Sequence, residues 1–139
     1  MVDDLDYRWR HPVSDDELCV LTRAHGGSAE VGWWERVRTH SLGWATAHLR
    51  DGLLVSFVNV AWDGSDHAFL LDTKTRAEYQ RRGIATRVVR LAIDHARSAG
   101  CTWLHVEFED ERRLAPFYFG ACGFRPTPAG LIHLPSVDR

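Results

Sequence analysis

The stretch TKTRAEYQRRGIAT, residues 73–86, decides the fold because it lies where a strand pattern passes into a helix pattern. Within it, Gln80 is followed by Gly83 three residues later and by Ala85 two residues after that. Small residues at the start of a helix let a ligand approach the backbone, and the first helical turn leaves N–H groups unpaired at the positive end of the helix dipole. With arginines at positions 81 and 82, the pattern predicts a site for a phosphate or pyrophosphate group.

The same pattern has a plainer interpretation. A single Q-x-x-G-x-A sequence is short enough to arise by chance, and arginines at a helix start can form a solvated rim. The stretch is not a P-loop, because GK[ST] is missing, and it is not a dinucleotide fingerprint, because GxGxxG is missing. This pattern alone therefore leaves two interpretations open: a binding site for an anion, or a chance sequence with solvated arginines.

Upstream of this stretch, the sequence predicts helices followed by an antiparallel meander. Ser14 and Glu17 form a capping box that starts a helix, and Gly26 ends it. A second short helix is expected over Trp33–Thr39. Alternating β-forming residues predict three strands over residues 41–48, 53–62 and 68–75, with a tight turn at residues 51–52.

Downstream of it, apolar residues at a spacing of four predict a helix over Gly83–Ala99. A strand over Thr102–Phe108, buried on both faces, should follow. A helix over Arg112–Cys122 is expected next, weakened at Pro116. Final short strands are expected around residue 124 and over residues 131–134. The whole pattern predicts a mixed α/β domain of the α+β type around one sheet.

Composition and length predict one domain over residues 1–139. The 139 residues are 45% hydrophobic and 26% charged, which are ordinary globular values. The net charge of −2 argues against attraction of the whole surface to nucleic acid or to an anionic membrane. No apolar segment approaches the roughly 20 residues of a membrane-spanning helix, and no signal peptide is visible.

Cysteine and histidine usage predicts no metal site. The three cysteines include no CxxC pair, and the eight histidines lack ligand spacing. Reduced thiols and the absence of a signal peptide together favour a cytoplasmic protein. The sequence leaves a homodimer open.

Residues 78–85 resemble motif A, Q/R-x-x-G-x-G/A, of the GNAT superfamily of N-acetyltransferases. Residues 117–118 and 123–124 read FY and GF, which looks like a later element of that superfamily. The spacing of the two motifs and the order of the elements also match, so the resemblance covers about residues 42–134. It implies a mixed, mainly antiparallel sheet flanked by helices, with a splayed central strand pair that forms a slot for a thioester.

The resemblance implies acetyl-CoA as the acyl donor, bound largely by backbone groups. The residues that match motif A and would hold the pyrophosphate are Gln80, Arg81, Arg82, Gly83, Ile84, Ala85 and Thr86. The strand edge that would pair with the pantetheine arm consists of Thr73, Lys74 and Thr75. A strand amide near Thr73 would polarise the thioester carbonyl, in the manner of an oxyanion hole.

Two residues are candidates for proton transfer. Tyr118 is the candidate general acid, since a phenol with a pKa near 10 suffices to protonate a departing thiolate. It lies five residues before Gly123, where many members of the superfamily have four, and Phe119 occupies the usual place. Either a bulge in the helix re-aims Tyr118, or the acid role is empty or filled by water; a packed core ring is the alternative. Asp72 is the candidate base or substrate anchor, with Glu107 in reserve.

The acceptor is expected to be a small-molecule or peptide amine. By resemblance, Trp33 and Trp34 lie in the helical region that covers the acceptor cleft, and Trp62 lies beside Asp63 at the turn after a central strand. Aromatic faces with the carboxylate of Asp72 would suit a cationic or aromatic amine. Packing of the rings in the core is the alternative interpretation.

The function expected from the resemblance is acetyl-CoA-dependent N-acetylation of a primary amine by direct attack in a ternary complex. The main alternative is a non-catalytic acyl-CoA-binding or sensing module of the same fold, which the phenylalanine at position 119 favours. Binding of nucleic acid through the arginines of this region is a third and weaker hypothesis.

Overall fold

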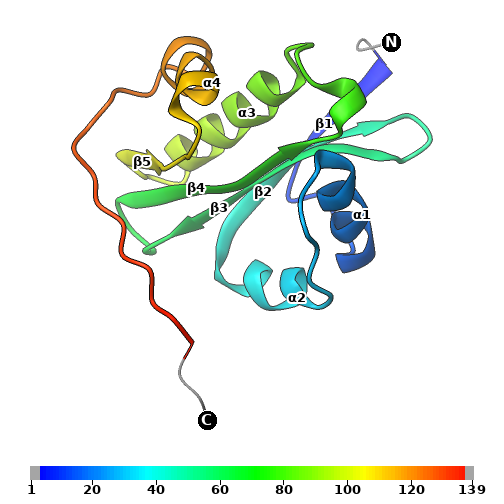
Figure 1. Cartoon of the computed structure of the whole chain (residues 1–139), viewed down its shortest axis with the longest axis horizontal. Helices are drawn as coiled ribbons and strands as arrows, with labels where there is room; N and C mark the ends of the chain where they lie inside the picture. Colours follow the sequence, from blue (N-terminus) through cyan, green and yellow to red (C-terminus); the bar gives the residue numbers. More distant parts are fainter. Residues whose placement is uncertain (1–3, 137–139) are drawn as a thin grey trace.

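The computed structural model describes residues 4–136, apart from the side chain at position 111, as one twisted sheet with helices on both faces (Figure 1). The elements in chain order are β1 (Leu5–Trp9), α1 (Asp15–His25), α2 (Trp33–Val37), β2 (Ser41–Leu49), β3 (Leu54–Trp62), β4 (His67–Thr75), α3 (Ile84–Ser98), β5 (Trp103–Val106) and α4 (Glu111–Ala115). Short 3-10 turns cover Arg38–His40 and Ala77–Tyr79, and a π-helical turn over Pro116–Ala121 follows α4.

The sheet has the order β1-β2-β3-β4-β5. Its first four strands are antiparallel neighbours, and only β4 and β5 run parallel, joined through α3. The predicted meander is therefore confirmed as β2–β3–β4. Strand β1 was not expected; it pairs with the outer edge of β2, from Leu5 opposite Leu49 to Trp9 opposite Ala45.

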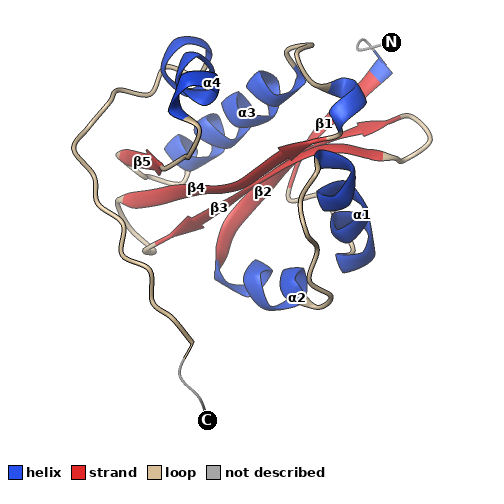
Figure 2. Ribbon diagram, viewed as in Figure 1, coloured by secondary structure: helices blue, strands red, loops and turns tan. Residues whose placement is uncertain are grey.

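Helix α3 lies on one face of the sheet and helices α1 and α2 lie on the other (Figure 2). Two hydrophobic clusters hold these layers together, one on each face. Helix α3 packs on one face through residues spaced three and four apart, which is the arrangement that its sequence predicted. On the other face, Leu18 and Leu21 of α1 pack with Trp34 and Phe57. Helix α1 begins with the expected capping box between Ser14 and Glu17.

Strand β4 leaves its neighbour β5 part-way along its length. The parallel pairing runs from His67 opposite Trp103 to Leu70 opposite Val106 and stops there, whereas β4 continues to Thr75. The pairing of β4 with β3 shifts over the same segment, so that Asp72 and its neighbour Thr73 form a bulge. Asp72 adopts a left-handed backbone with φ of 60°. This open segment of β4 is the splay that the family resemblance implied.

Two expectations for the C-terminal part were wrong. Strand β5 is shorter than expected and is not buried on both faces, because Trp103 is 56% exposed. In the described chain, no strand follows β5, and residues 125–136 run as an extended arm along one end of the sheet (Figure 1). The side chains of Leu131, Ile132 and Leu134 on this arm are 78–80% exposed.

Candidate active site

The start of α3 presents a row of backbone amides without protein acceptors. Gly83 precedes the helix with φ of 79°, and Arg81 is also left-handed with φ of 63°. The first hydrogen bond of the helix runs from the Arg87 amide to the Gly83 carbonyl, 3.2 Å away. Among the described residues, no acceptor is recorded for the amides of residues 81–86. A Cβ placed on Gly83 would meet no atom within 4 Å, so the backbone at this residue is open to a ligand.

These amides border a cavity of about 280 Å³ that extends along the free edge of β4. The cavity lies between three segments: β4 beyond its last pair with β5, the turn that leads into α3, and the helical segment around Tyr118. Its lining includes nine of the residues predicted from sequence, which are Thr73, Lys74, Thr75, Gln80, Arg81, Gly83, Ala85, Thr86 and Tyr118. The structure therefore brings both predicted halves of a donor site together.

Two residues of the matched motif are absent from this lining. Ile84 is 1% exposed and its side chain belongs to the core under α3, so only its backbone can serve a ligand. The guanidinium of Arg82 lies 5.4 Å from the centre of the Tyr79 ring, at the rim. Within the motif, the side chain of Ile84 is therefore buried in the core, whereas the positive charge of Arg82 is exposed.

The outward edge of β4 is free at Thr73 but is covered at Thr75. The Thr75 amide donates to Nδ1 of His25 over 3.1 Å, and the same nitrogen lies 2.9 Å from the Thr75 carbonyl oxygen. The Gln80 side-chain amide donates to that carbonyl as well, over 3.1 Å. His25 lies fifty residues earlier in the chain, at the end of α1. A ligand that pairs with Thr75 must therefore displace this ring.

Tyr118 reaches the cavity from a π-helical turn. Within Pro116–Ala121, the Cys122 amide bonds to the carbonyl of Phe117, five residues earlier, over 2.9 Å. A π-turn accommodates one residue more than an α-helical turn. The bulge proposed to explain the extra residue between Tyr118 and Gly123 is therefore present.

The Tyr118 ring is 6% exposed and stacks on Phe108, with ring centres 4.7 Å apart. Burial raises the pKa of its phenol, and a hydrogen bond with the side chain of Thr73 partly offsets that rise. The phenol consequently remains protonated at neutral pH while its ring lines the cavity. Tyr118 is therefore a packed core ring that also lines the cavity, and its role as the general acid stays a prediction.

Asp72 lies outside the cavity lining, at the bulge of β4. Its side chain is exposed to solvent, although nearby protein atoms partly desolvate the carboxylate. This desolvation raises its pKa, and the positive charge of Lys74 opposes the rise. Within the described chain, no hydrogen bond or ion pair of the Asp72 carboxylate is recorded.

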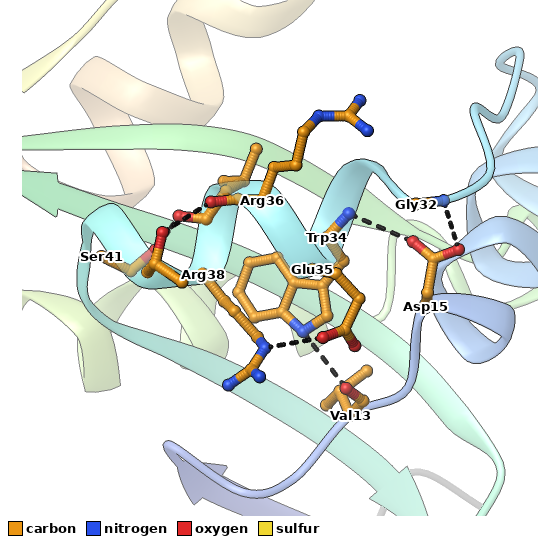
Figure 3. Close-up of polar contacts among 10 residues, drawn as sticks. Val13, Asp15, Gly32, Trp34, Glu35, Arg36, Arg38 and Ser41 are labelled. Atoms are coloured by element: carbon orange, nitrogen blue, oxygen red, sulfur yellow. Dashed lines mark hydrogen bonds and ion pairs between the residues drawn. The ribbon is translucent and has the colours of Figure 1, made fainter.

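The three tryptophans do not converge on one pocket. Trp34 is fully buried, and its indole N–H donates to the Val13 carbonyl over 3.1 Å, so this ring cannot contact an acceptor (Figure 3). Trp62 packs at the far end of β3, against the core under α3. Only Trp33 lies beside the site, and the ammonium of Lys74 already sits 5.0 Å from its ring centre. The three tryptophans therefore do not form together the expected aromatic-lined pocket for an amine.

A carboxylate of α1 fixes the segment that carries Trp33. Asp15 accepts hydrogen bonds from the amide of Gly32 over 2.7 Å and from the amide of Trp34 over 3.1 Å (Figure 3). These bonds hold the first turn of α2 against α1. They also lower the pKa of the Asp15 carboxyl, the bond from Gly32 most of all.

Sequence reasoning missed five residues that line the cavity: His25, Tyr79, Arg113, Leu114 and Phe117. The last two precede Tyr118 by four residues and by one, so helical spacing could have indicated Leu114. No local pattern marks His25, which reaches the site only through the packing of α1. Among residues 4–136, no group of three or more potential metal ligands is found.

A family model for the acetyltransferase (GNAT) family matches residues 6–124. The chain belongs to the GNAT acetyltransferase family. As a member of this family it is a transferase that uses an acyl-CoA donor. A comparison with curated protein sequences finds none that matches the chain. No helix of the described part is long and apolar enough to cross a membrane.

Solved structures share the fold of this GNAT-family chain. A GNAT family acetyltransferase from Streptococcus pneumoniae gives a TM-score of 0.80 at 21% identity, covering 94% of this chain and 98% of that one. A putative acetyltransferase from Deinococcus radiodurans gives 0.77 at 17% identity, with 96% and 90% covered. The GNAT family N-acetyltransferase YhbS from Escherichia coli, in complex with CoA, gives 0.71 at 15% identity, with 88% and 69% covered.

Proposed function

We propose that this GNAT-family enzyme transfers an acetyl group from acetyl-CoA to a primary amine by direct attack within a ternary complex. One observation carries the proposal: the unpaired amides of residues 81–86 open into a cavity that continues along the free end of β4 to Tyr118. A negatively charged group fits the amides, and an extended chain with amide groups fits the strand edge.

Acetyl-CoA would be held by the two ends of this cavity. Its pyrophosphate would accept hydrogen bonds from the amides that follow Gln80, at the positive end of α3. Its pantetheine arm would pair with the edge of β4 at Thr73, whose amide, unlike that of Thr75, has no recorded side-chain acceptor in the described chain. The Thr73 amide would then stabilise negative charge on the carbonyl oxygen as the amine attacks.

Two proton transfers complete the reaction. The attacking amine must be neutral, and Asp72, directly or through water, would accept its proton; the raised pKa of this carboxyl makes it a better base than an ordinary aspartate. The bond between the carbonyl carbon and sulfur breaks, and Tyr118 would protonate the departing thiolate. A phenol kept protonated by burial suits that role.

Binding of the donor is tested by titration calorimetry with acetyl-CoA. We expect micromolar affinity and a loss of at least about tenfold in Gly83→Glu, because a carboxylate would occupy the anion site. Gly64→Glu is the matched control: Gly64 has φ of 85° and open space around it, but lies in the β3–β4 turn. Equal affinities in both variants and the wild type would contradict the donor site.

Turnover separates the enzyme from a non-catalytic acyl-CoA-binding module, which the phenylalanine at position 119 still favours. CoA release is followed with a panel of primary amines in the wild type and in Asp72→Asn. Amine-dependent release that falls in the variant supports catalysis. Binding of acetyl-CoA with no amine-dependent release supports the sensing module instead.

A further inference from the structure

The sequence contains one lysine, Lys74, among sixteen arginines. A lysine ammonium is a compact point charge, whereas a guanidinium is a planar fork. Lys74 lies on the open segment of β4, between the bulge at Asp72 and the end of the strand, and contributes to the cavity lining. A unique and compact cation therefore stands next to the proposed site of acyl transfer.

The Lys74 ammonium is held in place by neutral groups. Its Nζ donates to Oγ1 of Thr22 over 2.8 Å, and that hydroxyl in turn donates to the carbonyl of Leu18 over 2.7 Å. The ammonium also lies 5.0 Å from the ring centre of Trp33 and 6.0 Å from that of Phe57. These contacts fix its position without neutralising its charge.

No carboxylate of the described chain lies within 4.0 Å of Lys74. The charge is half-buried, and a partly desolvated charge without a counter-ion is unfavourable unless a ligand supplies one. Asp72, two residues earlier, attracts the ammonium but forms no ion pair with it. The open strand thus presents one positive and one negative group, and neither neutralises the other through direct contact.

We propose that the acceptor is a zwitterion, an amine that also carries a carboxylate or phosphate, with its anion bound by Lys74 and its ammonium directed to Asp72. This assignment rests on the proposed N-acetyltransferase function. A second cation in the acceptor would be repelled by Lys74, which also covers the Trp33 ring. Polyamines and other polycationic acceptors are therefore disfavoured.

Matched acceptor pairs test the anion directly. Acetylation of phenylalanine, histidine and serine is compared with that of 2-phenylethylamine, histamine and ethanolamine. We expect the wild type to favour at least one amino acid over its decarboxylated partner by about tenfold or more in kcat/KM, the scale of one charge-assisted contact. Lys74→Met should bring that ratio close to one, and Lys74→Arg, which keeps the charge, should retain part of it.

Chemical labelling gives a readout that does not depend on turnover. Because Lys74 is the only lysine, its acylation by an N-hydroxysuccinimide ester is read by mass spectrometry from a single peptide. With CoA present, the favoured amino acid should slow this labelling several-fold, and its decarboxylated partner should not. Turnover without preference or protection overturns the inference and leaves the proposed function standing. Protection without turnover contradicts the proposed function, and with it the assignment of an acceptor, and leaves Lys74 only as a binding site for an anion. The absence of both turnover and protection contradicts both proposals.

Discussion

At the scale of single residues, chemistry at this site depends on a few side chains whose surroundings differ from those of ordinary surface groups. Tyr118 has a buried ring and a raised phenol pKa, and it reaches the cavity only because a π-turn accommodates one additional residue. The same ring contributes to the core through its stack on Phe108. Removing the hydroxyl alone therefore separates its chemical role from its packing role.

Tyr118→Phe should lower kcat by about 10- to 100-fold, because proton donation to the thiolate is lost. The affinity for acetyl-CoA should change little, because the variant loses the bond to the Thr73 side chain but keeps the backbone groups that would hold the donor. The stack on Phe108 remains, so the midpoint of thermal unfolding should change little. Tyr7→Phe, on β1, is the control. Steady-state kinetics and calorimetry provide the measurements, and an unaltered kcat would assign the acid role to water.

His25→Ala should tighten the binding of acetyl-CoA by about three- to tenfold. The His25 ring must leave the Thr75 amide before the pantetheine arm can pair there, and one net hydrogen bond amounts to about 1 kcal/mol. His133→Ala, on the exposed arm, is the control. Weaker binding in His25→Ala would indicate that the ring stays in place and supports the donor.

The cysteines should react slowly with thiol reagents at neutral pH. Burial raises the pKa of the Cys122 thiol to about 11, against the attraction of Arg90, so its thiolate fraction is about 100-fold below that of a free cysteine. Alkylation by iodoacetamide, followed by mass spectrometry, should be slow in the native protein. All three cysteines should react in guanidinium; rapid native labelling of Cys122 would contradict its burial.

At the scale of elements, the acceptor side depends on how α2 is attached to α1. Helix α2 has only five residues and no side-chain cap of its own, so it is too short to be stable alone. The carboxylate of Asp15 supplies acceptors for the amides of Gly32 and Trp34. This attachment positions Trp33 and, through it, the ammonium of Lys74.

Asp15→Asn should destabilise the protein at neutral pH and much less in acid. The pKa of Asp15 is lower in the folded than in the unfolded chain, so its contribution is present above the unfolded value near 4 and disappears as the pH falls through the folded value. Denaturant unfolding at pH 7 and at pH 3 measures this difference. An equal difference between variant and wild type at both pH values would contradict the ionised bond.

At the scale of the whole molecule, the sheet ends in an uncovered edge. No strand of the described chain pairs with the outer side of β5, and the face beside it exposes Phe69, Leu71 and Trp103 by 40–56%. The C-terminal arm does not pack on this region, because its side chains Leu131, Ile132 and Leu134 are themselves 78–80% exposed. Exposed apolar surface of this extent is typical of an interface.

We expect two copies of the chain to associate through this arm and edge, and the variant Leu131→Ser with Ile132→Ser and Leu134→Ser to abolish the association. Sedimentation velocity over a concentration series measures it. The stability of the isolated subunit should change by less than about 0.5 kcal/mol, because these side chains are exposed within the chain. A wild type that remains monomeric at high micromolar concentration would contradict the interface.

The sequence alone determined most elements and the donor half of the site. The capping box of α1, the meander and α3 follow from local rules, because capping and side-chain periodicity act within one element. The motif from Gln80 to Ala85 could be located for the same reason, since a helix start and its unpaired amides are contiguous in the chain. Strand β1 was missed because its stability comes from pairing with β2.

Tertiary structure decided everything that depends on residues far apart in sequence. His25 contacts the edge of β4 at Thr75, fifty residues later in the chain. Lys74 lies against Trp33, which is 41 residues earlier. The tertiary structure also decided that the strands expected after β5 do not form in the described chain. A strand needs a pairing partner, and only the assembled sheet can provide one. Local patterns report which element a segment forms, whereas the contacts between elements depend on the packing of the whole chain.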